Sequence, residues 1–147
     1  MQSKRLNSSN GQQTYALVFA AGDEAKSELE RFAREHDLTA AHFTGIGAFA
    51  DVTLGYFDWE KKEYKPIPIH EQVEVATLAG DIAVNDGEPE VHAHLVVGDA
   101  SGRAHAGHLL EGHVRPTLEI FLTETPAELR KIVDEETGLA LIDPDAS

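Results

Sequence analysis

Three histidines in this chain have the type and spacing of metal ligands. His92 and His94 form a His-x-His pair, and His108 follows in an Ala-Gly-His-Leu motif. Residues two apart on a β-strand point to the same face of a sheet, so the pair presents two imidazoles side by side. Imidazole nitrogens bind zinc at about 2.0–2.1 Å. A metal site is predicted if the fold brings the third imidazole to the first two.

The segment around these histidines has the pattern of a β-hairpin. Residues 91–97 are strand-like, residues 98–102 are rich in turn formers, and residues 103–110 can return antiparallel. Cross-strand neighbours in a hairpin have Cβ atoms about 5 Å apart, and diagonal neighbours are about 7–8 Å apart. This spread suits three imidazoles that converge on one ion.

The expected register pairs Val97 with Arg103. It places His108 directly opposite His92 and diagonal to His94, and these three histidines form the candidate metal site. A slip of one residue or a bulge would turn the third histidine to the opposite face. The alternative is that all three are surface or hydrogen-bonded core residues, as most single histidines are.

His105 is separated from the candidate ligands by the same register. It lies three residues before His108 in the chain and therefore points to the other face of the hairpin, beside Leu95. We predict that His105 is dispensable for metal binding.

Composition indicates one globular domain. The chain has 147 residues and a mass of 16.0 kDa, which is enough to bury a core. We expect a domain over residues 13–142, after a polar segment, 1–12, and before a short tail, 143–147. Without cysteine, a soft-metal site must use histidine. No stretch approaches the roughly 18 apolar residues of a membrane span, and no signal peptide is evident, so we expect a cytoplasmic protein.

The charge balance disfavours binding to nucleic acid. Asp and Glu total 26 whereas Lys and Arg total 12, which gives a formal net charge of −14. The basic residues never cluster beyond pairs, and a polyanion would be repelled by such a surface. We expect neither nucleic acid nor a membrane as a partner of the isolated chain.

Two other kinds of site are disfavoured. Gly45-Ile46-Gly47 resembles part of a dinucleotide-binding fingerprint, but a strand follows it and the third glycine is missing. We expect these glycines to permit a β-bulge or a close approach of two backbones. The chain has no Gly-x-Ser-x-Gly motif and no cysteine, so nucleophilic catalysis has no support.

Strand and helix signals alternate along the chain and predict an α+β domain. We expect a central, mostly antiparallel twisted sheet of about seven strands flanked by two helices. Asp23 can cap a helix that runs to about Glu35, and Thr125 to Glu128 form a capping box for a second helix that ends at Gly138. The strand-like segments are residues 13–20, 39–49, 51–59 after a kink near Ala50, the proline-containing edge segment 64–69, 71–84, the histidine hairpin and 117–123.

Several motifs together resemble one protein family. They are Thr-Gly-Ile-Gly-Ala-Phe at 44–49, Leu-Gly-Tyr-Phe-Asp at 54–58, Glu-Val-Ala-Thr-Leu-Ala-Gly at 74–80, His-Ala-His-Leu at 92–95, Gly102, Ala-Gly-His-Leu at 106–109 and Thr-Leu-Glu-Ile at 117–120. With these motifs, the chain resembles the stand-alone prokaryotic form of the plants-and-prokaryotes-conserved (PPC) domain from about residue 15 to residue 123. One departure is Ala106, which replaces the first of two glycines that usually precede the last histidine of the family.

The resemblance implies a central antiparallel sheet, a fold like that of acetolactate decarboxylase, and assembly as a homotrimer. In prokaryotic members it implies a metal site, often zinc, at positions that match His92, His94 and His108. Plant members carry AT-hooks that supply the DNA contact, whereas this chain has no Arg-Gly-Arg-Pro hook. The DNA-binding association of the family therefore extends only weakly to this chain.

Two function classes remain open. The first is a homotrimeric module that holds zinc or another divalent transition metal and binds a small ligand or a protein partner. The second is a zinc-dependent lyase or hydrolase for a small carboxylic or keto acid, because three histidines leave a fourth zinc position open. Catalysis would also need a general acid or base, for which Glu119 is the candidate. The favoured alternative is that Glu119 orients a ligand imidazole, lines the pocket or lies on the surface. Catalytic residues and enzyme activity stay open, although the lack of an evident acid–base pair favours the binding module.

Overall fold

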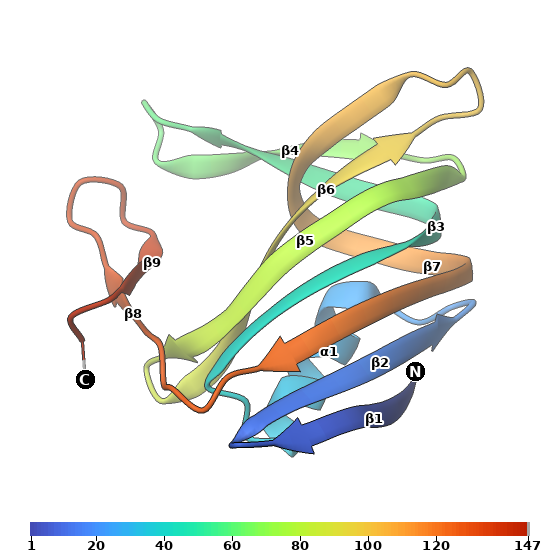
Figure 1. Cartoon of the computed structure of the whole chain (residues 1–147). Coiled ribbons are helices and arrows are strands. Elements are labelled where there is room, and N and C mark those ends of the chain that lie inside the picture. Colours follow the sequence, from blue (N-terminus) through green and yellow to red (C-terminus); the bar gives the residue numbers. More distant parts are fainter. Residues whose placement is uncertain (147) are drawn as a thin grey trace.

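Nine strands and one helix make up residues 1–146, which are the part of the chain described by this computed structural model (Figure 1). Within this part, no helix has the length and apolar character that crossing a membrane requires. The elements are β1 (Gln2–Ser9), β2 (Gln12–Ala20), α1 (Ala25–Glu35), β3 (Ala40–Asp58), β4 (Glu63–Ile69), β5 (Val73–Asn85), β6 (Glu88–Gly98), β7 (Ala104–Glu124), β8 (Arg130–Val133) and β9 (Ala140–Asp143).

All nine strands belong to one sheet, with a main path of β1-β2-β7-β3-β5-β8-β9. β6 pairs with both β5 and β7, and β3 pairs with the same two strands, so β3, β5, β6 and β7 close a ring. The pairings are antiparallel except that of β5 with β8, which confirms the mostly antiparallel sheet. Among the described strands β4 pairs with β3 alone, as predicted for an edge strand.

The hydrophobic core lies between the sheet and α1. Alternate residues of β2, namely Tyr15, Leu17 and Phe19, are buried, as the period of two in a strand predicts. The apolar stripe of the helix includes Leu29 and Phe32, and the ring of Phe32 contacts that of Tyr15 edge-on with centroids 5.2 Å apart. Figure 1 shows α1 behind β2 and β7, so it covers one face of the sheet.

The helix is capped by Glu24 rather than by the predicted Asp23. The Glu24 carboxylate accepts hydrogen bonds from the backbone N–H groups of Lys26 at 3.1 Å and Ser27 at 2.7 Å. These bonds satisfy N–H groups that have no partner inside the helix. Asp23 instead pairs with the amino group of Met1 at 2.8 Å.

The predicted second helix over residues 125–138 is wrong, because tertiary hydrogen bonds tie this segment to β3 and β5. The Thr125 hydroxyl donates to the carbonyl of Ala40 at 3.1 Å instead of capping a helix. The carbonyl of Leu129 accepts a hydrogen bond from the N–H of Val84 at 2.8 Å. The chain then forms the β8–β9 hairpin, to which the β-branched residues of β8 are well suited.

The sheet therefore has nine strands and one helix beside it, not seven strands and two helices. β1 forms in the polar N-terminal segment, and β8 and β9 replace the second helix. By contrast, β3 is one continuous strand where two were predicted, over residues 39–49 and 51–59. β7 likewise joins the second strand of the histidine hairpin to the predicted strand 117–123. The kink expected near Ala50 corresponds to a shift in the β3–β7 register between Phe49 and Asp51.

Gly45 and Gly47 perform the backbone role predicted for them. The β3–β5 register shifts between these two glycines, as in a β-bulge. A Cβ atom at Gly47 would lie 2.3 Å from the carbonyl oxygen of Thr117, so β7 can approach β3 this closely only where no side chain is present. The prediction of a bulge and a close backbone approach is confirmed.

Candidate metal centre

The histidine hairpin forms, but its register is shifted by two residues from the predicted one. His94, not His92, lies directly opposite His108, and Val97 pairs with His105 rather than with its predicted partner. Because side chains alternate with a period of two, a shift of two residues leaves each side chain on its predicted face. His92 takes the diagonal position.

The shift originates in the loop that joins β6 to β7. The Asp99 carboxylate accepts hydrogen bonds from the N–H groups of Ser101 at 2.8 Å and Arg103 at 3.1 Å, and the N–H of Asp99 donates to the Arg103 carbonyl at 3.0 Å. These bonds close the loop one residue later than expected. Asp99 also contacts Nε2 of His105 at 3.3 Å, on the face opposite the candidate ligands.

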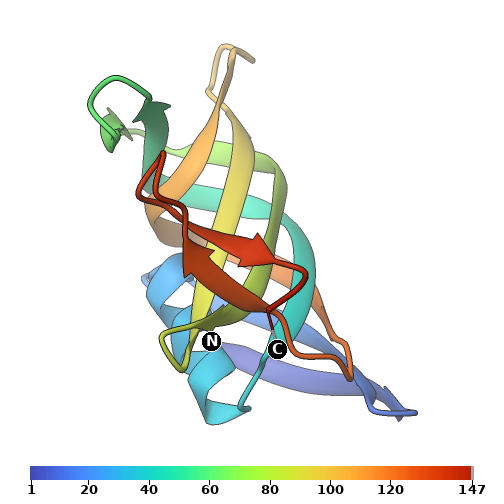
Figure 2. The ribbon, with the colours of Figure 1, turned by 90° about the vertical axis from the view of Figure 1, so that its left-hand side faces the viewer.

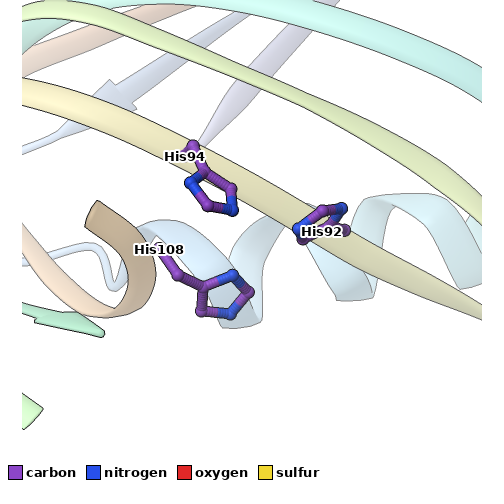
Figure 3. Close-up of side chains that lie close together, drawn as sticks. All are labelled: His92, His94 and His108. Atoms are coloured by element: carbon purple, nitrogen blue, oxygen red, sulfur yellow. The ribbon is translucent and has the colours of Figure 1, made fainter. Parts of the chain in front are cut away.

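The rings of His92, His94 and His108 lie together on the side of β6 and β7 that faces away from the core (Figure 3). The ring centroids of His92 and His94 are 5.1 Å apart, and the centroid of His108 lies 5.4 Å from each of the other two. One ring nitrogen from each residue lies within 4.8 Å of the others. Tetrahedral zinc with bonds of about 2.0–2.1 Å needs ligand atoms about 3.3 Å apart, a distance that side-chain rotation can reach.

The environment of the rings favours neutral imidazoles. Burial, together with the neighbouring charges of His92 and His94, lowers the pKa of His108 to about 4. Burial, followed by the charge of His92, also lowers the pKa of His94. Nδ1 of His108 is buried without a hydrogen-bond partner in residues 1–146, and the Tyr64 ring stacks on this imidazole with 4.4 Å between centroids. Neutral imidazoles and an unsatisfied buried nitrogen fit a metal ligand set.

Asp81 is the carboxylate that contacts a candidate ligand. Its Oδ2 lies 3.1 Å from Nδ1 of His92, and the two residues are paired directly across β5 and β6. When Nδ1 donates its proton to the carboxylate, Nε2 is the nitrogen left to coordinate. The other oxygen, Oδ1, is buried without a hydrogen-bond partner in the described chain and lies 3.8 Å from Nζ of Lys131.

The histidines open onto a cavity of about 550 Å³, a size that suits a small ligand. Its walls come from α1, β4, β6, β7 and the β8–β9 hairpin, which Figure 2 shows in front of β5 and β6. Lys131 of β8 is almost fully buried in the wall, with a side chain 2% exposed, and donates to Glu90 at 2.9 Å. Lys26 of α1 pairs with Glu30.

The structure does not bring Glu119 to the histidines. Glu119 is exposed on β7 and lines a separate hollow together with Glu74. The side chains that do surround the cluster are Asp81, Tyr64 and Lys131, and sequence reasoning missed all three. Correct strand pairing would have indicated Asp81, but Lys131 lies in the segment that was predicted to be helical.

These features define a class of small α+β domain in which one strongly curved sheet carries an open three-histidine cluster. A sequence profile of the Plants and Prokaryotes Conserved (PCC) domain matches residues 6–126. The chain belongs to this family, which is the PPC family that its motifs resemble.

Solved structures of similar proteins cover most of the chain. A PPC protein of Pyrococcus horikoshii is 33% identical, with a TM-score of 0.84, over 99% of this chain and 97% of that one. A metal-containing protein of Archaeoglobus fulgidus is 32% identical, with a TM-score of 0.82, over 88% and 91% of the two chains. A Ralstonia eutropha protein with a provisional DNA-binding designation is 34% identical, with a TM-score of 0.82, over 88% and 90%.

Two further likenesses are more limited. The bifunctional protein GlmU of Synechococcus sp. strain JA-3-3Ab is 36% identical over 113 residues, which are 76% of this chain but only 17% of that protein. A Staphylococcus aureus protein similar to alpha-acetolactate decarboxylase is 9% identical, with a TM-score of 0.55, over 75% of this chain and 51% of that one. This last likeness shows the fold alone.

Proposed function

We propose that this chain is a metal-binding module in which His92, His94 and His108 hold one divalent ion, with zinc as the best fit. The observation that carries the proposal is the convergence of one ring nitrogen from each histidine to within 4.8 Å of the others. Three imidazoles without a thiolate suit zinc or another divalent transition metal. The metal-containing relative from A. fulgidus supports this assignment.

Three protein ligands leave one zinc position open, and the cavity beside the histidines gives a small ligand access to it. A bound metal would supply a Lewis-acid contact for that ligand. The carboxylates that line the cavity, Glu30 and Glu90, each pair with a lysine, so neither is free to act as a general acid or base. We therefore propose ligand binding, rather than a zinc-dependent lyase or hydrolase reaction, as the function of the site.

Metal content after dialysis of single alanine variants tests the metal proposal. We expect the wild-type chain to retain one ion and the variants at His92, His94 and His108 to lose it, because each variant leaves only two ligands. The matched control is His105→Ala, which removes an imidazole from the opposite face of the same hairpin. Loss of metal from the His105 variant, with retention by the His108 variant, would show that the site is assigned wrongly.

We also propose that the chain assembles as a homotrimer through the sheet face opposite α1. On this face the adjacent strands β2, β3 and β7 carry Val18, Ile46 and Phe121, which are 44%, 63% and 59% exposed. Glu119 of β7 pairs with both Val18 and Ile46, and Phe121 lies diagonal to these two. Large apolar side chains that are exposed together on one sheet face often mark interfaces. We propose that a second copy of the chain covers these side chains. The proposal of three copies in the assembly comes from the family resemblance.

A further inference from the structure

We infer that the cavity beside the histidines binds a small organic monocarboxylate and that the ammonium group of Lys131 selects it. This inference rests on the proposed metal site and adds the chemical class of the ligand. Lys131 lies on β8, beyond residues 6–126 that match the family profile. The ligand contact is therefore supplied by the C-terminal hairpin, separately from the histidine motifs.

The Lys131 ammonium is buried and has hydrogen-bond donors to spare. Its side chain is 2% exposed, and an ammonium carries three N–H donors. Within residues 1–146 it makes one hydrogen bond, to Glu90 at 2.9 Å. Its other carboxylate neighbour, Asp81, is 3.8 Å away, which is beyond hydrogen-bond distance. A buried cation with spare donors on a cavity wall suits an anionic ligand.

The charges around the cavity favour a single negative charge on the ligand. The carboxylates of Glu30, Glu90 and Asp81 outnumber the ammonium groups of Lys26 and Lys131 by one. A divalent ion held by neutral imidazoles would turn this excess into one net positive charge. One negative charge on the ligand would neutralise this net charge, so a monoanion is the ligand that balances the site.

The remaining wall of the cavity is suited to a short apolar tail. Leu139 and Leu141 at the β8–β9 hairpin line it, together with the ring of Tyr64. The cavity of about 550 Å³ has room for several carbon atoms beside a carboxylate. Apolar walls that surround a few charged groups indicate an organic acid rather than a bare inorganic anion.

Calorimetric titration of the zinc-loaded full chain with butyrate tests the inference, with 1-butanol as the uncharged probe of the same length. We expect Lys131→Met to weaken butyrate binding at least about tenfold, because it removes a charge-assisted hydrogen bond. The wild type should bind 1-butanol at least about tenfold more weakly than butyrate for the same reason. The matched control is Arg130→Met, which removes an exposed cation next to Lys131 that pairs with Glu128 outside the cavity.

A double variant separates a direct contact between Lys131 and the ligand from the effect of the net charge of the cavity. Glu90→Gln with Lys131→Met removes one charge of each sign, so the net charge of the cavity stays that of the wild type and no unpaired Glu90 carboxylate remains. We expect it to bind butyrate as weakly as the single Lys131 variant. Wild-type affinity in either Lys131 variant would overturn the inference, and so would equal binding of butyrate and 1-butanol. Zinc retention, measured separately, would then leave the metal proposal intact, whereas a wild type without zinc would overturn both.

Discussion

Replacement of Asp81 by asparagine is expected to weaken zinc binding about tenfold while the chain stays folded. The carboxylate holds Nδ1 of His92 at 3.1 Å, and loss of such a contact behind a metal-bound imidazole costs about 10–100-fold in affinity, or about 1.4–2.8 kcal/mol. The side chains of His92 and Asp81 are 43% and 28% exposed, so water screens the contact and the lower end of this range applies. Lys131 keeps its partner Glu90, which limits the cost to folding.

Competition between the protein and a chromophoric chelator for zinc measures this change directly. The matched control is Asp51→Asn, because Asp51 makes the same kind of contact with His113, an imidazole about as exposed as His92, at 2.8 Å and away from the cluster. The zinc affinity of the Asp51→Asn variant should equal that of the wild type. If Asp81→Asn bound zinc as tightly as the wild type, or if both variants lost affinity equally, Asp81 would not orient His92 as argued.

Three further outcomes are expected. Light scattering should show a trimer for the wild type and a smaller species for Phe121→Glu, because the variant places a further charge among the exposed apolar side chains. A stable wild-type monomer at micromolar concentration would contradict the proposed trimer. Mobility-shift assays with random duplex DNA should show no appreciable binding at physiological salt, given the net charge of −14, and tight, salt-sensitive binding would refute it. A hydrogen bond to Asp51 raises the pKa of His113. The pairing of protonated His113 with Asp51 therefore stabilises the fold below about pH 6.5, and this stabilisation is lost as the pH rises through the raised pKa. In urea titrations, His113→Ala should therefore lower the free energy of unfolding by less than about 1 kcal/mol at about pH 6, and by less still at about pH 9. An equal loss of stability at both pH values would exclude this pairing.

The face on which the histidines lie was predictable because it depends only on the parity of the strand. His92 and His94 are two residues apart, and an even shift of register leaves His108 beside them. The exact partner was not predictable in the same way, because the loop is closed by side-chain hydrogen bonds of Asp99 with Ser101 and neighbouring residues. Such bonds compete with the turn pattern on which the predicted register depended.

The C-terminal hairpin shows where local patterns fail. A capping box predicted a helix, but the backbone groups of Thr125 and Leu129 bond to β3 and β5 instead. No local pattern reports those distant partners. The burial of Lys131 in the cavity wall depends on this hairpin, so the sequence alone did not indicate it.

The contact between Asp81 and His92 depends on the glycine that precedes Asp81. A Cβ atom at Gly80 would lie 2.3 Å from the carbonyl oxygen of His92 and 2.4 Å from Cζ of Phe43. Any side chain there would push β5 away from β6 or displace a core ring, since buried rings have no free space around them. Gly80 therefore sets how closely the two strands approach, and this approach brings the carboxylate to Nδ1 of the imidazole. The segment Thr-Leu-Ala-Gly, which belongs to one of the motifs shared with the family, ends at a residue whose lack of a side chain keeps the histidine cluster in place.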